Sequence, residues 1–265
     1  MRITPATIST LLALVLASSC ASEERTPDVE EPGAPPVPEK VAPPLEATSI
    51  EAFEEGLRAA EIWFGGPEER FAEIGRGTLA LAIENGLNPD GRVLDIGAGS
   101  LRVGWWFLHY IEPKNYHAVE PVKSRIDTAV QLIGADINVY YNSDWEFPAV
   151  EFDLVIARSI WTHAAKWMIS KMLSEFAENS APDGKFLTSV KLARYPSEDY
   201  QGDEWVGRIE KSDAPGLIRH SLSWMKKECK AHGLELEVMG ELGKQTWILI
   251  TRIQPDPAGL DTVPE

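Results

Sequence analysis

The chain has 265 residues, of which 44% are hydrophobic and 25% charged, and this composition predicts one substantial globular domain with an appendage. Its net charge of −16 argues against electrostatic binding of nucleic acid, because such binders normally carry a basic face. We therefore expect no nucleic-acid partner.

The first twenty residues are predicted to be a signal peptide. Arg2 is the only charge before Glu23, and the apolar run at 11–17 is shorter than the about 20 residues that a membrane span needs. Small residues, with Ala17 where leucine is more usual, lead directly to Cys20. This arrangement resembles the lipobox of bacterial lipoproteins, which implies lipidation of Cys20 and a membrane-anchored lipoprotein of the cell envelope. The alternatives are a plain secretory signal or, if the signal is spurious, a cytoplasmic protein.

Residues 21–50 combine prolines and acidic residues with few aliphatic and no aromatic side chains. Such a segment cannot bury enough apolar surface to fold, so we expect a disordered, extended linker there. The folded domain is expected over 51–253 and a disordered tail over 254–265. If Cys20 is lipidated, only Cys229 remains, so the domain can form no internal disulfide.

Segments typical of strands and helices alternate along the folded part. Near-helical spacing of apolar residues between Ile50 and Phe64 predicts an opening amphipathic helix. Two final strands joined by residues 240–243 predict a hairpin. This order predicts an α/β fold: a Rossmann-like, mostly parallel seven-stranded sheet with helices on both faces and a C-terminal antiparallel hairpin. Further helices are predicted over 78–84, 101–111, 123–132, 167–179 and 221–232, and strands over 92–96, 116–120, 137–141, 152–157, 185–191 (after a turn at 182–184), 234–238 and 246–252.

The turn after the first of these strands points to a cofactor site. Asp95 ends the strand, and Gly97 and Gly99 follow, which lets bare backbone approach a polar ligand at the strand end. The dinucleotide fingerprint would require a third glycine where Arg102 stands. A nicotinamide-dependent oxidoreductase is therefore the weakest alternative.

Together with the hairpin, this turn resembles the first motif of class I S-adenosylmethionine-dependent methyltransferases, acid-x-Gly-x-Gly-x-Gly. Leu101 departs from that motif at the third glycine, and the run from Gly99 to Arg102 is similar to a bacterial branch of mostly unassigned substrate. The resemblance implies S-adenosylmethionine as the cofactor. The residues of this turn that it implies in cofactor binding are Asp95, Gly97, Ala98, Gly99, Ser100 and Arg102.

The same resemblance implies roles for three later strand ends. Glu120 would bind the ribose hydroxyls, Asp144 the adenine amino group, and Trp145 would pack on the purine ring. Arg158 closes the strand whose end faces the sulfonium and is grouped with the cofactor residues. The alternatives are that Glu120 is an exposed glutamate at a strand end, and that Asp144 and Trp145 belong to an acidic loop whose tryptophan fills the core. The absence of Asn-Pro-Pro-Tyr argues against methylation of adenine or glutamine amino groups.

The sulfonium is already a good leaving group, so the protein mainly aligns the acceptor and excludes water. The chain shows no cluster typical of a metal site. His163 is our candidate general base, and the alternative is that it caps or packs the following helix. Arg102 could pair with the cofactor's carboxylate or with an acidic acceptor, or be an ordinary surface arginine.

Other side chains carry weaker expectations. Trp161 either shapes the acceptor pocket or fills the core. Tyr195, Trp205 and His220 lie where the family often builds that pocket, and residues 64–76 could form a lid.

The leading hypothesis is a methyltransferase that acts on a small molecule. The alternative is a non-catalytic lipoprotein of the same fold that serves as a binding or scaffold module. Because S-adenosylmethionine is made and kept in the cytoplasm, the export signal supports this alternative. The next methionine after Met1 is Met168, so a later start of translation would need an unusual codon.

Overall fold

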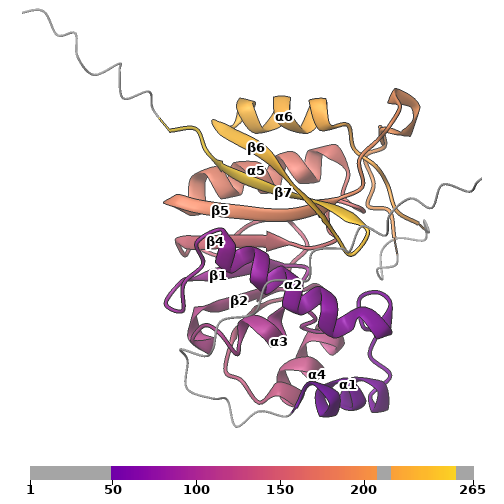
Figure 1. The fold of residues 1–265 in the computed structure, drawn as a ribbon, viewed down its shortest axis with the longest axis vertical. Coiled ribbons are helices and arrows are strands. Elements are labelled where there is room, and N and C mark those ends of the chain that lie inside the picture. The colour runs from indigo at the N-terminus through magenta and orange to yellow at the C-terminus, as the bar shows by residue number, and fades with distance from the viewer. Residues whose placement is uncertain (1–48, 208–215, 255–265) are drawn as a thin grey trace, which may run out of the picture. The chain divides into compact units, whose positions relative to one another are not determined.

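Among the residues that the computed structural model describes, seven strands form one sheet in the order β3-β2-β1-β4-β5-β7-β6 (Figure 1). The strands from β3 to β5 are parallel, and β7 is antiparallel to both β5 and β6. The predicted Rossmann-like sheet with its C-terminal hairpin is thus confirmed. The strands are β1 (Val93–Ile96), β2 (Tyr116–Val119), β3 (Asn138–Tyr140), β4 (Phe152–Ala157), β5 (Ser180–Val190), β6 (Leu234–Leu242) and β7 (Gln245–Arg252).

The described residues are 49–207 and 216–254, and they belong to the compact unit over residues 34–265. The predicted signal peptide with Cys20, nearly all of the linker and the tail after residue 254 lie outside them. The described part begins with Ser49, whose side chain caps the first helix. No helix of the described part is long and apolar enough to span a bilayer.

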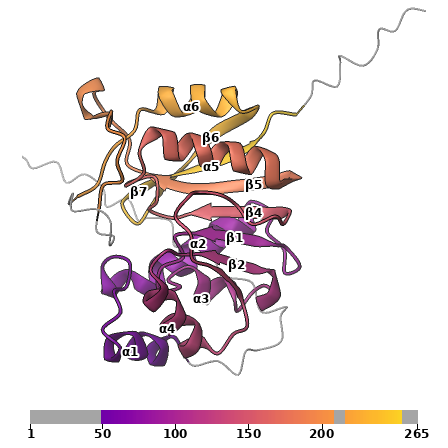
Figure 2. The ribbon, with the colours of Figure 1, turned by 180° about the vertical axis from the view of Figure 1, so that it is seen from behind.

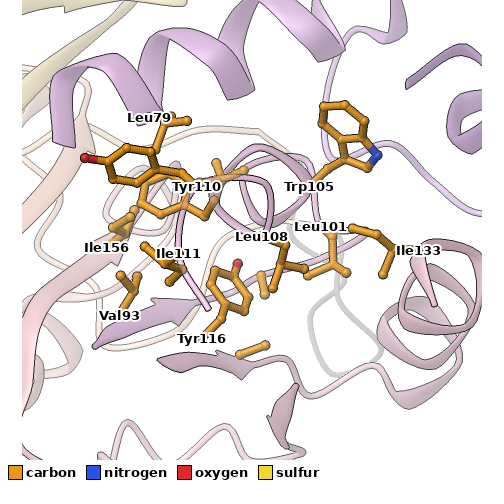
Figure 3. Close-up of a cluster of buried hydrophobic side chains, with 14 of the residues drawn as sticks. Leu79, Val93, Leu101, Trp105, Leu108, Tyr110, Ile111, Tyr116, Ile133 and Ile156 are labelled. Atoms are coloured by element: carbon orange, nitrogen blue, oxygen red, sulfur yellow. The ribbon is translucent and has the colours of Figure 1, made fainter. Parts of the chain in front are cut away.

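Helices cover both faces of the sheet, as Figures 1 and 2 show from opposite sides. Successive strand residues point to opposite faces, so Val93 belongs to one apolar core and Leu94 to the other. The first core also holds residues of α1 to α4 and appears in close-up in Figure 3. The second holds residues of α5 and α6. The helices are α1 (Ile50–Ala59), α2 (Phe71–Glu84), α3 (Gly104–Phe107), α4 (Lys123–Ile133), α5 (Lys166–Asn179) and α6 (Leu222–Ala231), with short 3₁₀ turns at Glu68–Arg70, Pro113–Asn115 and Pro196–Glu198.

Two predicted helix boundaries are wrong at α1 and α2. Phe64 lies beyond α1, in a loop, and is buried because its ring packs edge-on against Phe71 at 5.4 Å. Helix α2 begins seven residues before the predicted start. Gly75 and Gly77 interrupt the apolar pattern there, because a side chain at either position would collide with neighbours: a Cβ on Gly75 would lie 2.3 Å from the carbonyl oxygen of Arg102.

Further differences occur in α3, β5 and the hairpin. The predicted helix over 101–111 is regular only in α3. Before α3, Leu101 adopts a left-handed backbone with φ of 58°, and residues 108–110 after α3 form turns. The predicted turn at 182–184 lies inside β5, next to a register shift between Phe152 and Leu154 of β4. The hairpin strands extend to Leu242 and Gln245, which leaves a two-residue turn.

Candidate cofactor and acceptor site

A cavity of about 670 Å³ lies where β1, β2, β3 and β4 end, within the range of about 300–1,000 Å³ typical of small-molecule sites. Segments that follow these strands form its walls, together with residues 63–65 and 204–205. The fold of the described residues thus places nearly all predicted site residues around one cavity. The predicted residues that line it are Asp95, Gly97, Ala98, Gly99, Ser100, Arg102, Glu120, Trp145, Arg158 and His163.

The glycine turn is shaped by backbone conformation. Gly97 and Gly99 have φ of 73° and 59°, a region that favours glycine. The N–H groups of Gly97 and Ala98 donate to the carbonyl oxygen of Val119 at 2.8 and 3.1 Å, which ties the turn to β2. The Oγ atom of Ser100 is buried and has no hydrogen-bond partner among the described residues, as expected of a group that a bound ligand would satisfy.

Asp95 is 1% exposed at the end of β1 and accepts a hydrogen bond from the Tyr116 hydroxyl. Burial raises the pKa of this carboxyl to about 6, although the bond from Tyr116 opposes the shift. Glu120 raises the same pKa and Arg158 lowers it. Asp95 is therefore a cavity carboxyl whose charge changes around pH 6.

Glu120 presents a fixed carboxylate beside the glycine turn. One oxygen accepts from the N–H of Gly99 at 3.0 Å, and the other from the N–H of Val122 at 2.9 Å. Arg125 pairs with Glu120 at 3.3 Å, and its guanidinium lies 5.4 Å from the ring centre of Trp63. Because Glu120 is only 3% exposed, the alternative of an exposed strand-end glutamate is wrong.

Arg102 and Arg158 converge on one loop from different strand ends. Nη2 of Arg102 donates to the carbonyl oxygen of Pro67 at 2.5 Å, and Nη1 of Arg158 donates to that of Gly65 at 3.2 Å. Burial lowers the pKa of each guanidinium to about 10. Arg102 is 3% exposed, so it is not an ordinary surface arginine. Of the predicted lid, Phe64 and Gly65 line the cavity, as does the neighbouring Trp63, whereas residues from 71 onward form α2.

Asp144 is a predicted site residue that the fold does not bring to the cavity of the described residues. Its side chain is exposed and accepts from the N–H of Glu146 at 3.1 Å, a local turn within the loop after β3. Trp145 does line the cavity, and its ring stacks on Trp205 with 5.6 Å between centroids. Trp205 stacks in turn on His163 at 5.2 Å, so an aromatic row forms one wall.

His163 is held in one tautomer. Its Nδ1 lies 2.5 Å from the carbonyl oxygen of Val206, and a carbonyl can only accept, so Nδ1 carries the hydrogen. The other ring nitrogen, Nε2, is then the proton acceptor. Burial lowers the pKa of His163, which keeps the ring neutral near pH 7. In the described structure no side-chain hydrogen bond caps α5, so the helix-cap alternative for His163 is wrong.

The remaining candidates separate by burial. Trp161 is fully buried and packs edge-on against Phe186, so it belongs to the core. Tyr195 is 65% exposed, and His220 is buried with Nε2 3.0 Å from the carbonyl oxygen of Ala164. Burial raises the pKa of the Cys229 thiol to about 12, so it is not a nucleophile.

Sequence reasoning missed Trp63 and Arg125 among the cavity residues. Arg125 lies in the first turn of α4, five residues after Glu120, and that acid–base spacing was the available signal. No local sequence pattern marks Trp63, because this residue precedes β1 and reaches the cavity only through the tertiary fold. Among the described residues, no group of three or more His, Cys, Asp or Glu could hold a metal ion.

Together, the sheet order and the strand-end cavity define a methyltransferase-like Rossmann fold. The sequence matches the family described as "Methyltransferase domain" over residues 68–237, so the chain belongs to this family, whose cofactor is S-adenosylmethionine. Family membership favours a methyltransferase over the nicotinamide-dependent oxidoreductase. No curated protein matches the chain.

Solved methyltransferases share the fold at low identity. A sugar N-methyltransferase from Streptoalloteichus sp. ATCC 53650 is 15% identical, with a TM-score of 0.54 over 82% of this chain and 98% of that one. An amino pentose methyltransferase from Micromonospora echinaspora, bound to S-adenosylmethionine, is 15% identical with a TM-score of 0.52 over 75% and 96%. Magnesium protoporphyrin IX methyltransferase from Synechocystis PCC 6803 is 12% identical with a TM-score of 0.51 over 78% and 86%.

Proposed function

We propose that this protein transfers a methyl group from S-adenosylmethionine to a small-molecule acceptor. The observation that carries the proposal is that one cavity holds both the glycine turn with Glu120 and the neutral imidazole of His163. Asp95, the turn from Gly97 to Arg102, and Glu120 would hold the cofactor. When bound, S-adenosylmethionine supplies an electrophilic methyl group on a good leaving group.

His163 would act as the general base of this reaction. Val206 fixes the hydrogen on Nδ1, so Nε2 can accept the proton that an acceptor hydroxyl or amine loses when it attacks the methyl carbon. Trp145 and Trp205 cover that side of the cavity and exclude water. Trp145 would also provide the surface on which the adenine ring packs.

Calorimetry with the purified protein tests the cofactor. S-adenosylmethionine and S-adenosylhomocysteine should bind, and NAD should not. Glu120→Ala should weaken both by at least about tenfold, because a charge-assisted hydrogen bond contributes about 1.5–3 kcal/mol. Glu237→Ala, on the exposed side of β6, is the matched control. Binding of neither S-adenosylmethionine nor S-adenosylhomocysteine, or equal affinity in both variants, contradicts the proposal.

We further propose that the mature protein is lipidated at Cys20 and anchored in the cell envelope, which the signal-like N-terminus supports. Mass spectrometry of the mature N-terminus measures this: a lipid-modified Cys20 is expected, and Cys20→Ser should move the protein to the soluble fraction. A soluble protein that retains Met1 contradicts the anchor.

The non-catalytic lipoprotein remains the second candidate because of the same signal. It predicts no methyl transfer to any acceptor even where S-adenosylmethionine binds. A screen with radiolabelled cofactor and His163→Ala as the control separates the two candidates.

A further inference from the structure

Formal charges around the cavity nearly balance. Its described lining holds four carboxyl groups and three guanidiniums: Asp95, Glu120, Glu146 and Glu204, with Arg102, Arg125 and Arg158. S-adenosylmethionine carries one carboxylate, one ammonium and one sulfonium, so the bound cofactor adds one net positive charge and closes the difference. Glu146 and Glu204 are exposed, so water and salt screen them, and Glu146 lies 3.7 Å from Nζ of Lys171. The occupied cavity therefore favours a neutral acceptor.

Trp167 presents apolar surface to the cavity close to the candidate base. It follows His163 by four residues, in the first turn of α5, and is 52% exposed. Its Nε1 donates to the carbonyl oxygen of Asp203 at 2.7 Å, which restrains the orientation of the indole. Among the described residues, no aromatic ring or cation packs on Trp167, whereas Arg125 lies over Trp63, the other exposed tryptophan of the cavity. The indole of Trp167 is thus an oriented surface that is left for a ligand.

The walls beside Trp167 suit a flat, apolar ligand. Met168 follows it in α5 and also lines the cavity. The ring of Trp205 stacks on both Trp145 and His163, so its own position is fixed. Aromatic rings attract one another by more than the area that they bury, so an oriented indole binds an aromatic ring better than a saturated ring of the same size.

The basicity of His163 limits which acceptor group it can serve. Burial lowers its pKa below the usual value of 6.5, so the neutral imidazole is a weak base. A phenol, with a pKa of about 10, gives up its proton to such a base far more readily than an aliphatic alcohol does. A protonated amine has a similar pKa, but it would bring a second positive charge close to the sulfonium.

We propose that the methyl acceptor is a neutral aromatic compound whose ring packs on Trp167 and whose phenolic hydroxyl receives the methyl group. This inference rests on the proposed function and names the acceptor class of the same site. The hydroxyl proton goes to Nε2 of His163 while the oxygen forms a bond to the methyl carbon. The carbon–sulfur bond breaks, and its electron pair stays on sulfur. The products are a methyl ether and S-adenosylhomocysteine, and the imidazolium returns its proton to water.

Calorimetry on the full chain saturated with S-adenosylhomocysteine tests this, with naphthol and its saturated counterpart decahydronaphthol as probes. Naphthol should bind at least about threefold more tightly, because aromatic pairing adds to area burial. Naphthoate and naphthylmethylamine, the charged probes, should bind more weakly than naphthol. With radiolabelled S-adenosylmethionine, naphthol should yield the labelled methyl ether and decahydronaphthol should not.

Two variants of Trp167 separate its ring from its hydrogen bond. Trp167→Leu should abolish the preference for naphthol, with S-adenosylhomocysteine affinity within about threefold of wild type. Trp167→Phe loses the bond to Asp203 but keeps a ring, so it should keep most of the preference. Tyr195→Leu, which removes an exposed aromatic side chain outside the cavity lining, is the control.

Each outcome decides the proposal. Equal or tighter binding of decahydronaphthol overturns it, as does a preference that survives in Trp167→Leu or is lost equally in Trp167→Phe. Tighter binding of either charged probe overturns it too, because the site then selects charge. Binding of naphthol without transfer to its hydroxyl overturns the assignment of the acceptor group. Failure to bind S-adenosylhomocysteine, measured first, overturns the proposed function and the inference with it.

Discussion

Leu101 adopts a backbone conformation that usually belongs to glycine. Its φ of 58° is left-handed, and its side chain is fully buried in the core around α3, where Figure 3 shows it. A left-handed L-residue costs about 1–2 kcal/mol, and burial of a leucine side chain returns about 1.5–3 kcal/mol. Leu101 therefore keeps the backbone shape that the motif's third glycine would have, and burial of its side chain in the core offsets the conformational strain.

Substitutions at Leu101 should reverse the usual order of stability, in which an alanine variant is more stable than a glycine variant. Leu101→Ala loses the buried side chain and keeps the strain, so it should lower the unfolding free energy by about 2–5 kcal/mol. Leu101→Gly loses the same contacts but relieves the strain, so it should be about 1 kcal/mol more stable than the alanine variant. Urea denaturation measures both. A glycine variant less stable than the alanine variant contradicts the strain.

Gly207 positions His163. Its φ is 139°, and a Cβ there would lie 2.4 Å from Nδ1 of His163. Gly207→Ala should displace the imidazole and lower kcat at least about tenfold while S-adenosylhomocysteine affinity stays unchanged. Gly216→Ala is the matched control, because Gly216 has φ of 112° and no atom of the described residues lies within 4 Å of a Cβ built there. Equal losses in both variants would show that backbone strain alone is responsible.

Asp95 makes stability depend on pH. Its folded-state pKa is raised from 3.8 to about 6, so its contribution to stability is fully present below 3.8 and is lost as the pH rises through 6. Asp95→Asn removes that loss and should become more stable than wild type between pH 4 and 7, by about 3 kcal/mol at the upper end. Denaturation at several pH values measures the difference, with the exposed Asp136→Asn as control. A difference that does not change with pH contradicts the shift.

At the scale of elements, β7 supports the end of β4. Gln245 donates to Oγ of Ser159 at 2.9 Å and accepts from the hydroxyl of Ser189 at 2.7 Å. The N–H of Ser159 donates to the hydroxyl of Ser189 at 2.7 Å, and Ser159 has a left-handed backbone with φ of 60°. The antiparallel strand therefore fixes a strained residue that lines the cavity.

Gln245→Leu should lower the unfolding free energy by about 2 kcal/mol, because it removes the hydrogen bonds to Ser159 and Ser189 and leaves the buried Ser189 hydroxyl without its acceptor. It should also weaken acceptor binding, because the segment after β4 loses its support. Denaturation and acceptor KM measure the two effects. The control is Gln131→Leu on the exposed side of α4, and a stability equal to that control contradicts the network.

At the scale of the whole molecule, the cavity connects segments that follow most strands of the sheet, so cofactor binding should stabilise the whole domain. A ligand at about one hundred times its Kd adds about 2.7 kcal/mol to the unfolding free energy. For a domain of this size Tm should rise by about 5–10 °C. Thermal unfolding with S-adenosylhomocysteine measures the rise. Glu120→Ala should show little of it at the same concentration, and an equal rise with NAD contradicts the site.

The fold and the cofactor half of the site were predictable because their signals are local. Residues 92–102 contain the strand, the acid and the glycines in one continuous run, and Glu120 directly follows its strand. Periodicity also marks buried strands and helices, since each element must bury its own apolar face. The boundary of α2 was missed because its glycines serve close packing with α3 and the hairpin, which no local pattern reveals.

The sequence by itself determined the order of strands and helices, the terminal hairpin and the strand-end cofactor motif, because these depend on residues adjacent in the chain. Only the tertiary structure decided that Asp144 turns away into its own loop, that Val206 and Gly207 hold His163, and that Arg102 and Arg158 meet at one loop. The contacts of His163 and of the two arginines join residues far apart in sequence, and they form only when the packed sheet brings its strand ends to one edge.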